Sequence, residues 1–199
     1  MIYIATLLLL LLPQTVVFSQ DEDPGRKILE EGLSEFRNGR YEQAMVTFRD
    51  LLTVGDGERY RGDAYFWIGR SALAAGRLDE AADNLEFFLR NFPEHRFVPE
   101  ATYQKGRLLY LQEDYQQAVS ALEAFTRNYP DSRFVPNAYY WIGESLYALG
   151  HHDRAAGMFR TVVHEFPESY RAEAADYRLS VIQLSRREES LLKLLRWSH

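Results

Sequence analysis

Apolar side chains recur at helical spacing along most of the chain and predict a series of amphipathic helices. In one segment the apolar positions are Tyr139, Ile142, Leu146 and Leu149, which are separated by three or four residues. This spacing places side chains on one side of a helix. A second kind of apolar segment stops before Phe92-Pro93, where the proline disfavours helix at the preceding residue. The pattern therefore predicts an all-α protein built from pairs of helices.

The helix pairs repeat with one period. Glycines and alanines recur every 37 residues, and prolines keep the same step. The small residues are Gly32, Ala44, Gly69, Ala81, Gly106, Ala118, Gly143 and Ala155. Small side chains let two helices approach closely, so we expect these positions to pack the two helices of each unit together. A fixed period of this length predicts a solenoid.

The repeated unit resembles the tetratricopeptide repeat, a helix–turn–helix of about 34 residues. The resemblance rests on an aromatic residue and a glycine in the first helix, on the turn Gly39 to Ala44, and on the closing proline. It covers Arg26 to Pro167, although Glu113 stands where the turn glycine is usual. The resemblance implies a right-handed superhelical solenoid of helix–turn–helix repeats, whose first helices line the concave face.

The connectors between units are similar to those of an exported bacterial subgroup of this family. Residues Tyr129 to Ala138 read Tyr-Pro-Asp-Ser-x-Phe-x-Pro-x-Ala. The subgroup includes the Tol–Pal-associated coordinator of cell division and the lipoprotein of the outer-membrane β-barrel assembly machine. This sequence has neither the amino-terminal coiled coil of the first nor the lipidated cysteine of the second.

The beginning of the chain predicts a secretory signal peptide. Six consecutive leucines, Leu7 to Leu12, precede Pro13, and the sequence Val17-Phe18-Ser19-Gln20 that follows predicts a cut after Ser19. Because Met1-Ile2-Tyr3 has no lysine or arginine, an uncleaved inner-membrane anchor is the alternative. We expect an exported, periplasmic protein that contacts a membrane only if this segment is uncleaved.

The period divides the chain into consecutive segments. We assign 1–19 to the signal peptide, 20–25 to a solvated linker, 26–61, 62–98, 99–135 and 136–171 to repeats 1 to 4, and 172–199 to capping helices. The capping segment is predicted to be a truncated fifth unit, with a first helix up to Leu184 and a short leucine-rich helix from Glu188 to Arg196. The alternatives for this leucine-rich end are a docking site for a partner and self-association with another copy.

The amino-acid composition argues against several kinds of site and partner. The chain has no cysteine, which excludes disulfides, thiolate metal sites and a lipid anchor on cysteine. Its net charge of -6 argues against nucleic acid as a partner, since such binding depends on lysine and arginine. No nucleophile motif, phosphate loop or metal motif is present, and the neighbouring His151 and His152 lie in a predicted turn. We expect no catalytic residue, no metal and no cofactor.

The remaining candidates lie on one side of the first helices. Counting 37 residues from unit to unit gives an aromatic row with charged residues beside it. The candidates are Phe66, Arg70, Tyr103, Arg107, Tyr110, Tyr140, Glu144, Tyr147 and Tyr177. Rings at such positions pack between helices, but they also supply rigid contact area, and the guanidiniums of Arg70 and Arg107 can bind a carboxylate. A further series, Arg59, Arg96 and Arg133, is expected to cap helix carbonyls.

These observations predict a non-catalytic scaffold that binds a protein or peptide segment in an aromatic and arginine groove. Its place would be the bacterial cell envelope, in envelope or outer-membrane protein assembly or in cell division. Two alternatives stay open at this point: a peptidoglycan or glycan-binding module, because aromatic rows also stack on sugars, and a self-associating structural protein.

Overall fold

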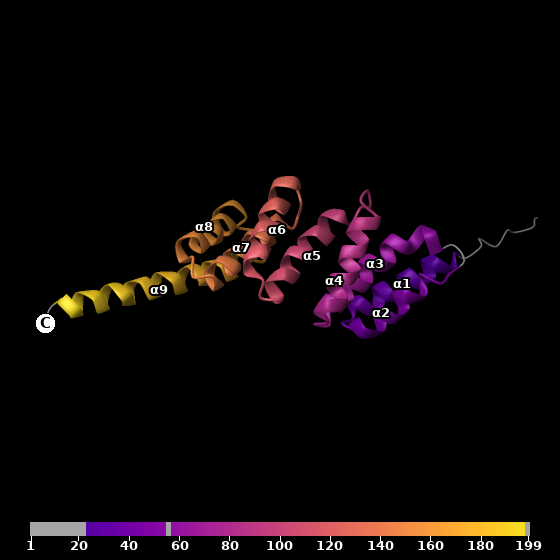
Figure 1. Ribbon diagram of the computed structural model, residues 1–199, viewed down its shortest axis with the longest axis horizontal. Helices are drawn as coiled ribbons and strands as arrows, with labels where there is room; N and C mark the ends of the chain where they lie inside the picture. Colours follow the sequence, from indigo (N-terminus) through magenta and orange to yellow (C-terminus); the bar gives the residue numbers. More distant parts are fainter. Residues whose placement is uncertain (1–22, 55–56, 198–199) are drawn as a thin grey trace, which may run out of the picture.

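The computed structural model describes residues 23–54 and 57–197, which form nine α-helices and no strand. The helices are α1 Pro24–Arg37, α2 Tyr41–Asp50, α3 Gly57–Ala74, α4 Leu78–Asn91, α5 Val98–Leu111, α6 Tyr115–Asn128, α7 Val135–Ala148, α8 His152–Glu165 and α9 Ala172–Trp197. Each helix packs on the helices before and after it, and the pairs follow one another along the long axis of the molecule (Figure 1). The prediction of an all-α solenoid is confirmed.

Tight turns join the two helices of each unit. Gly39, Gly76 and Gly150 adopt φ angles of 73°, 78° and 78° in these turns. Such positive φ angles are favourable only for glycine, which has no Cβ atom. The equivalent residue of the third unit is Glu113, with a φ of 64°. Prolines open α5 and α7, where a missing N–H costs no hydrogen bond.

The repeated small residues lie where the two helices of a unit cross. All four repeated alanines are fully buried. A Cβ atom on Gly106 would come within 2.5 Å of Leu122, and one on Gly143 within 2.7 Å of Phe159. Larger side chains at these places would force the helices apart. The core is correspondingly a row of clusters along the solenoid, with Phe48, Phe88, Phe125 and Phe159 among its fully buried side chains.

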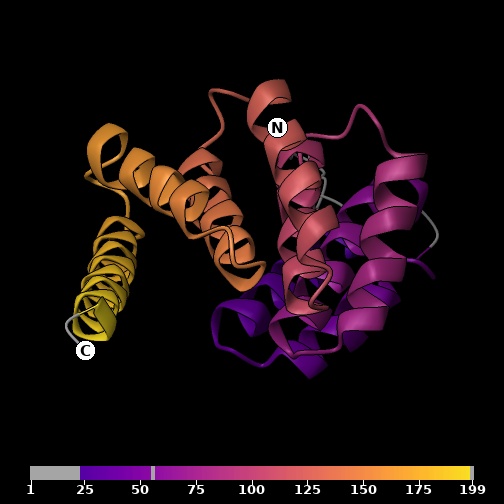
Figure 2. The ribbon, with the colours of Figure 1, turned by 60° about the vertical axis from the view of Figure 1, so that its left-hand side comes forward.

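The C-terminal segment differs from the expectation of two capping helices. One continuous helix, α9, runs from Ala172 to Trp197. The residues between Leu184 and Glu188 include neither glycine nor proline, so nothing in the sequence ends the helix there. The end of α9 projects beyond α7 and α8, and Figure 2 shows it at the outer edge of the molecule (Figures 1 and 2). The leucine-rich end therefore does not cover the last interface.

Unit boundaries follow the helix starts. The helices α5, α7 and α9 begin at Val98, Val135 and Ala172, where the sequence predicted units to begin at 99, 136 and 172. By contrast, α3 begins at Gly57, so the predicted boundary at 62 falls inside this helix. The signal peptide predicted for 1–19 lies outside the described residues.

Candidate functional site

The predicted groove residues come from the first helix of each unit. Among these helices α1 contacts α3, α3 contacts α5, and α5 contacts α7. Their side chains therefore form a continuous surface that crosses the units, which we call the first-helix face.

Two aromatic residues of the predicted groove belong to the core instead. Phe66 has no exposed surface, and its ring stacks on Phe97 of the following connector at a centroid distance of 4.2 Å. Tyr103 is 3% exposed and stacks on Phe134 at 4.9 Å in the same way. The prediction that these rings contact a partner is wrong, because a connector aromatic covers each of them.

The other tyrosines keep some access to solvent. Tyr110 and Tyr140 are partly buried and pack on the ring of Trp141, at centroid distances of 4.7 and 5.3 Å. Tyr147 packs on the imidazole of His152 at 4.9 Å. Tyr177, on α9, is exposed. Burial raises the pKa values of Tyr110 and Tyr140.

Arg70 is neutralised within the protein. Its Nη1 atom lies 2.7 Å from Oε1 of Glu100, in the first turn of the next unit's α5, and the two side chains are 23% and 8% exposed. The guanidinium also lies over the rings of Phe36 and Trp67. Burial lowers the pKa of Arg70, the Glu100 carboxylate opposes this effect, and the like charges of Arg133 and Arg107 add to the lowering.

Glu144 is likewise paired internally. Its carboxylate is buried and accepts hydrogen bonds from Nε and Nη2 of Arg178, on α9, at 2.6 and 2.5 Å. This two-bond geometry is the strong form of an arginine–carboxylate pair. The hydrogen bonding to Glu144 raises the pKa of Arg178. Glu144 and Arg178 thus tie α7 to α9, and the carboxylate is not available to a partner.

Arg107 differs from both of these arginines. Its Nε atom is buried without a hydrogen-bond partner, and its Cζ atom lies 5.6 Å from the ring centroid of Trp141. On the same helix, Oε1 of the buried Gln104 also has no hydrogen-bond partner. Within the described residues, no carboxylate forms an ion pair with Arg107.

A second guanidinium lies near the same tryptophan ring. Arg171 has its Cζ atom 4.9 Å from the Trp141 ring centroid and 4.6 Å from that of Tyr140. Its Nε atom donates to Oδ1 of Asn137 at 3.2 Å, a neutral acceptor. In the part of the chain that the structure describes, Arg171 has no ion pair either. We call Arg107, Trp141 and Arg171 the arginine cluster.

The hydroxyl of Tyr103 lies at the base of this cluster. It accepts a hydrogen bond from Nε1 of Trp141 at 3.1 Å, which fixes the indole ring. Burial raises the pKa of Tyr103 to about 12, and the positive charges of Arg107 and Arg171 act in the opposite direction. The two arginines are therefore within electrostatic reach of the same hydroxyl, and a positive region lies in the middle of the first-helix face.

The further arginine series, Arg59, Arg96 and Arg133, pairs with carboxylates of the preceding unit, and not with helix carbonyls as the sequence suggested. Each reaches a carboxylate on or beside the preceding first helix, at distances of 3.3, 2.6 and 3.3 Å. The pairs are Arg59 with Asp23, Arg96 with Asp63, and Arg133 with Glu100. Arg96 and Arg133 lie in connectors, whereas Arg59 lies in the first turn of α3. All three side chains pair with an acidic residue of the preceding unit instead of a helix carbonyl.

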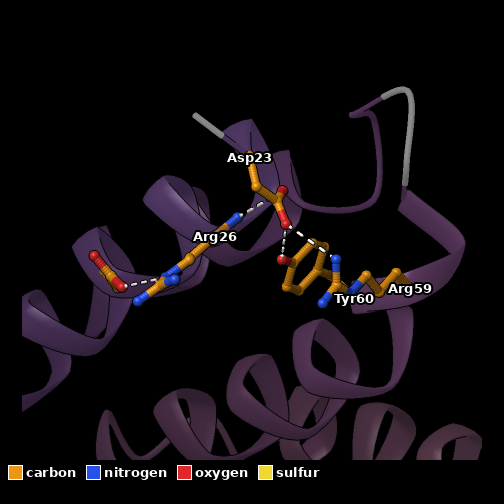
Figure 3. A network of polar contacts seen from close by, with 5 residues as sticks. Asp23, Arg26, Arg59 and Tyr60 are labelled. Carbon is orange, nitrogen blue, oxygen red and sulfur yellow. Dashed lines mark hydrogen bonds and ion pairs between the residues drawn. The ribbon is translucent and has the colours of Figure 1, made fainter. Parts of the chain in front are cut away.

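The first of these pairs also corrects the linker predicted for 20–25. Asp23 accepts a hydrogen bond from the backbone N–H of Arg26 at 3.2 Å, and so caps α1, which begins one residue after it (Figure 3). The same carboxylate accepts a hydrogen bond from the hydroxyl of Tyr60 and forms an ion pair with Arg59. The Tyr60 hydrogen bond is the main cause that lowers the pKa of Asp23. Residue 23 is therefore part of the first interface between units.

Other kinds of site are absent from the described part of the chain. No group of three acidic or histidine side chains is arranged to hold a metal ion in residues 23–54 and 57–197. None of the helices described there is long and apolar enough to cross a membrane. His151 and His152 lie at the mouth of a cavity of about 470 Å³ beside α9 and are exposed.

Comparison with known proteins decides the family. The model of the YfiO family, described as outer membrane lipoprotein, matches residues 58–188. The chain belongs to the YfiO outer membrane lipoprotein family. The resemblance to tetratricopeptide repeat proteins is thereby confirmed, and this family supports a scaffold for protein–protein interaction, a class that is generally non-catalytic. No curated protein sequence matches the chain.

Solved structures share the fold of this YfiO family member. MamA from strain AMB-1 is 22% identical over 86% of this chain and 88% of its own, with a TM-score of 0.60. MamA from Desulfovibrio magneticus RS-1 is 18% identical over 83% and 97%, with a TM-score of 0.62. A kinesin light chain with nearly identical TPR-like repeats, from Podospora anserina, is 17% identical over 88% and 94%, with a TM-score of 0.65. At these identities the likeness shows the fold alone.

Sequence reasoning missed two of the three residues of the arginine cluster, Trp141 and Arg171. Trp141 follows directly after a predicted groove residue, and Trp67 holds the same place two units earlier, so the 37-residue count could have found them. Arg171 lies one residue outside the connector series, at 38 residues from Arg133. No periodic signal identifies it.

Proposed function

We propose that the protein is a non-catalytic scaffold of a bacterial cell envelope that binds an acidic segment of a partner protein at the arginine cluster. The observation that carries the proposal is the unpaired state of Arg107 beside Arg171, in a protein whose net charge is -6. Two guanidiniums close to one aromatic ring suit a carboxylate, because each offers donors in a fixed plane.

The partly exposed rings around the cluster support a protein ligand. Tyr110, Tyr140 and Trp141 form a packed aromatic group with one accessible side. Such rings lose little conformational entropy on binding and are frequent at the centre of protein interfaces.

The envelope location rests on the predicted signal peptide and on the family. An exported protein would meet partners in the periplasm, in envelope or outer-membrane protein assembly or in cell division. The sequence contains no cysteine, the residue that carries the lipid of a lipoprotein. In this proposal, its partners or an uncleaved N-terminal segment therefore hold the protein in the envelope.

Crosslinking in the native envelope tests whether a partner protein binds at the arginine cluster. A photoreactive amino acid at Tyr140 would capture whatever lies at the cluster, and mass spectrometry would identify it. We expect Arg107→Glu to lose the captured proteins, because a carboxylate there repels an acidic segment. Arg127→Glu is the matched control: it makes the same charge change on an exposed side chain of α6 and should leave capture unchanged.

Two results would refute the proposal. An unchanged set of captured proteins in the Arg107→Glu variant, with a normal circular dichroism spectrum, would show that the cluster does not bind the partner. Sedimentation of the protein with purified cell-wall sacculi, lost on Tyr140→Ala, would favour the glycan alternative. The packing of Phe66 and Tyr103 in the core leaves few rings free for sugar stacking, which is why we favour a protein segment.

A further inference from the structure

The helix α9 carries two stripes on opposite sides. Ala175, Leu179 and Ile182 are buried against the solenoid, at spacings of four and three residues. The same spacing continues through Arg186, Glu189 and Lys193. The side of α9 that faces the body is therefore apolar up to Ile182 and charged beyond it, and Arg186 pairs there with Asp153 of α8. The second half of α9 is not built to fold back on its own solenoid.

Several apolar residues of the second half, among them Leu184, Leu191 and Leu195, lie on the other side of the helix. They are offset by two residues, or about 200°, from the buried stripe. This outer stripe consists of Tyr177, Val181, Leu184, Glu188, Leu191 and Leu195. Tyr177, Leu184 and Leu191 are 67%, 64% and 55% exposed. The alternating spacing of four and three residues is the heptad pattern of a coiled coil.

We propose that the outer stripe is a self-association surface on which the α9 helices of two copies pack antiparallel. An antiparallel pair centred near Arg186 places Tyr177 opposite Leu195 and Val181 opposite Leu191 of the other copy, and Leu184 opposite Glu188. Every position of the stripe then has a counterpart on an identical helix, as an isologous twofold interface requires. The two solenoids lie on the outer sides, because each packs on the opposite side of its own α9.

Glu188 decides the orientation and the kind of partner. In a parallel pair in register, two Glu188 carboxylates would meet in the seam and repel each other. In the antiparallel pair each faces Leu184, with Arg187 of the other copy less than one turn away. A lipid surface fits less well, since Glu188 would have to enter the apolar boundary of an acyl layer.

The outer stripe is short, so we expect the two copies to associate weakly. Its length from residue 177 to 195 corresponds to about 28 Å of helix, so we expect a reversible dimer whose population rises with concentration. Sedimentation velocity of the protein purified after export, over a range of concentrations, measures this directly. The double variant Leu184→Glu and Leu191→Glu should remain monomeric. Leu194→Glu, an equally exposed leucine on the flank of the stripe, is the matched control and should still dimerise.

Two further variants separate the proposal from loss of folding or solubility. Glu188→Leu completes the apolar seam and should tighten association by about tenfold or more. Because the chain has no cysteine, single cysteines report orientation cleanly. Val181→Cys mixed with Leu191→Cys should form a mixed disulfide, whereas Leu191→Cys alone should crosslink poorly.

Three outcomes would overturn the proposal. The first is a monomer at every concentration for both the unchanged protein and Glu188→Leu. The second is efficient crosslinking of Leu191→Cys to itself, which would indicate a parallel pair. The third is flotation of the monomer with phosphatidylethanolamine and phosphatidylglycerol vesicles that is lost in the double leucine variant, which would make the stripe a lipid-binding surface. All three are independent of the arginine cluster.

Discussion

The second and third units have the same fold, but the arginine that they share by position forms an ion pair in the second unit and, among the described residues, none in the third. Arg70 in the second unit reaches Glu100 of the next unit. Thirty-seven residues later, Arg107 has the same place, but the residue equivalent to Glu100 is Asn137. One missing carboxylate leaves a guanidinium without an ion pair in the middle of the first-helix face. In a repeat scaffold, the replacement of one side chain can thus leave a charged group of the preceding unit without its partner.

The third unit departs from the repeat at two other places. Gln104 stands where Trp67 and Trp141 occupy the neighbouring units, and its carbonyl oxygen is buried without a hydrogen bond. Glu113 stands in the turn where the other three units have glycine. Local rules that are broken together in one unit of an otherwise regular protein indicate a specialised region.

The largest expected effect is on the paired side of the comparison. Glu100→Gln removes the carboxylate that pairs with Arg70 and with the exposed Arg133, and leaves Arg70 mostly buried without an ion pair. We expect the free energy of unfolding to fall by about 3 kcal/mol, the lower end for a broken buried pair, because Arg70 keeps some contact with water. Chemical denaturation followed by circular dichroism measures it.

The control for this variant is an ion pair of the same length at the surface. Arg61 and Glu58 also lie 2.7 Å apart, but their side chains are 39% and 85% exposed. Glu58→Gln should change the free energy of unfolding by less than about 0.5 kcal/mol. Equal losses in the two variants would mean that burial of the Arg70 pair contributes nothing, and the contrast with Arg107 would lose its basis.

The second prediction converts the third unit into a copy of the second. Asn137→Glu supplies the carboxylate that Arg107 lacks, next to Arg171. We expect the free energy of unfolding to rise by about 1.5 kcal/mol, the lower end for a new hydrogen bond to a charged group, and partner capture at the cluster to be lost. Thermal melting and the crosslinking assay measure the two effects.

Asn128→Glu is the corresponding control, since Asn128 is exposed at the end of α6. It adds the same negative charge away from the cluster and should leave both stability and capture unchanged. Undiminished capture by Asn137→Glu would show that the partner does not use the guanidiniums.

The fold was predictable because its causes are local and repeated. Gly106 against Leu122 and Gly143 against Phe159 are contacts inside one unit, and the spacing of small residues in the sequence reports them directly. The prediction of two separate capping helices was wrong for a related reason. Residues 184–188 contain ordinary helix formers, so the end of the periodic pattern did not mean the end of the helix.

The site was less predictable because it depends on contacts between units. Burial of Phe66 and Tyr103 comes from Phe97 and Phe134 in the following connectors, and no count along one helix includes these rings. The pairing of Arg70 with Glu100 joins residues 30 positions apart. Sequence reasoning found Arg107 as a candidate but could not tell that Arg70 is neutralised.

The smallest expected effect concerns the turn of the third unit. The φ of 64° at Glu113 costs a side-chain-bearing residue about 1 kcal/mol, part of which glycine gives back as unfolded-chain entropy. We expect Glu113→Gly to raise the free energy of unfolding by about 0.5 kcal/mol. The reverse change in the second unit, Gly76→Glu, should lower it by a similar amount, because a Cβ atom there meets nothing within 4 Å and only the backbone is strained. If both variants destabilise the protein, Glu113 makes a favourable interaction of its own, and the third unit is specialised in its turn as well as at Asn137.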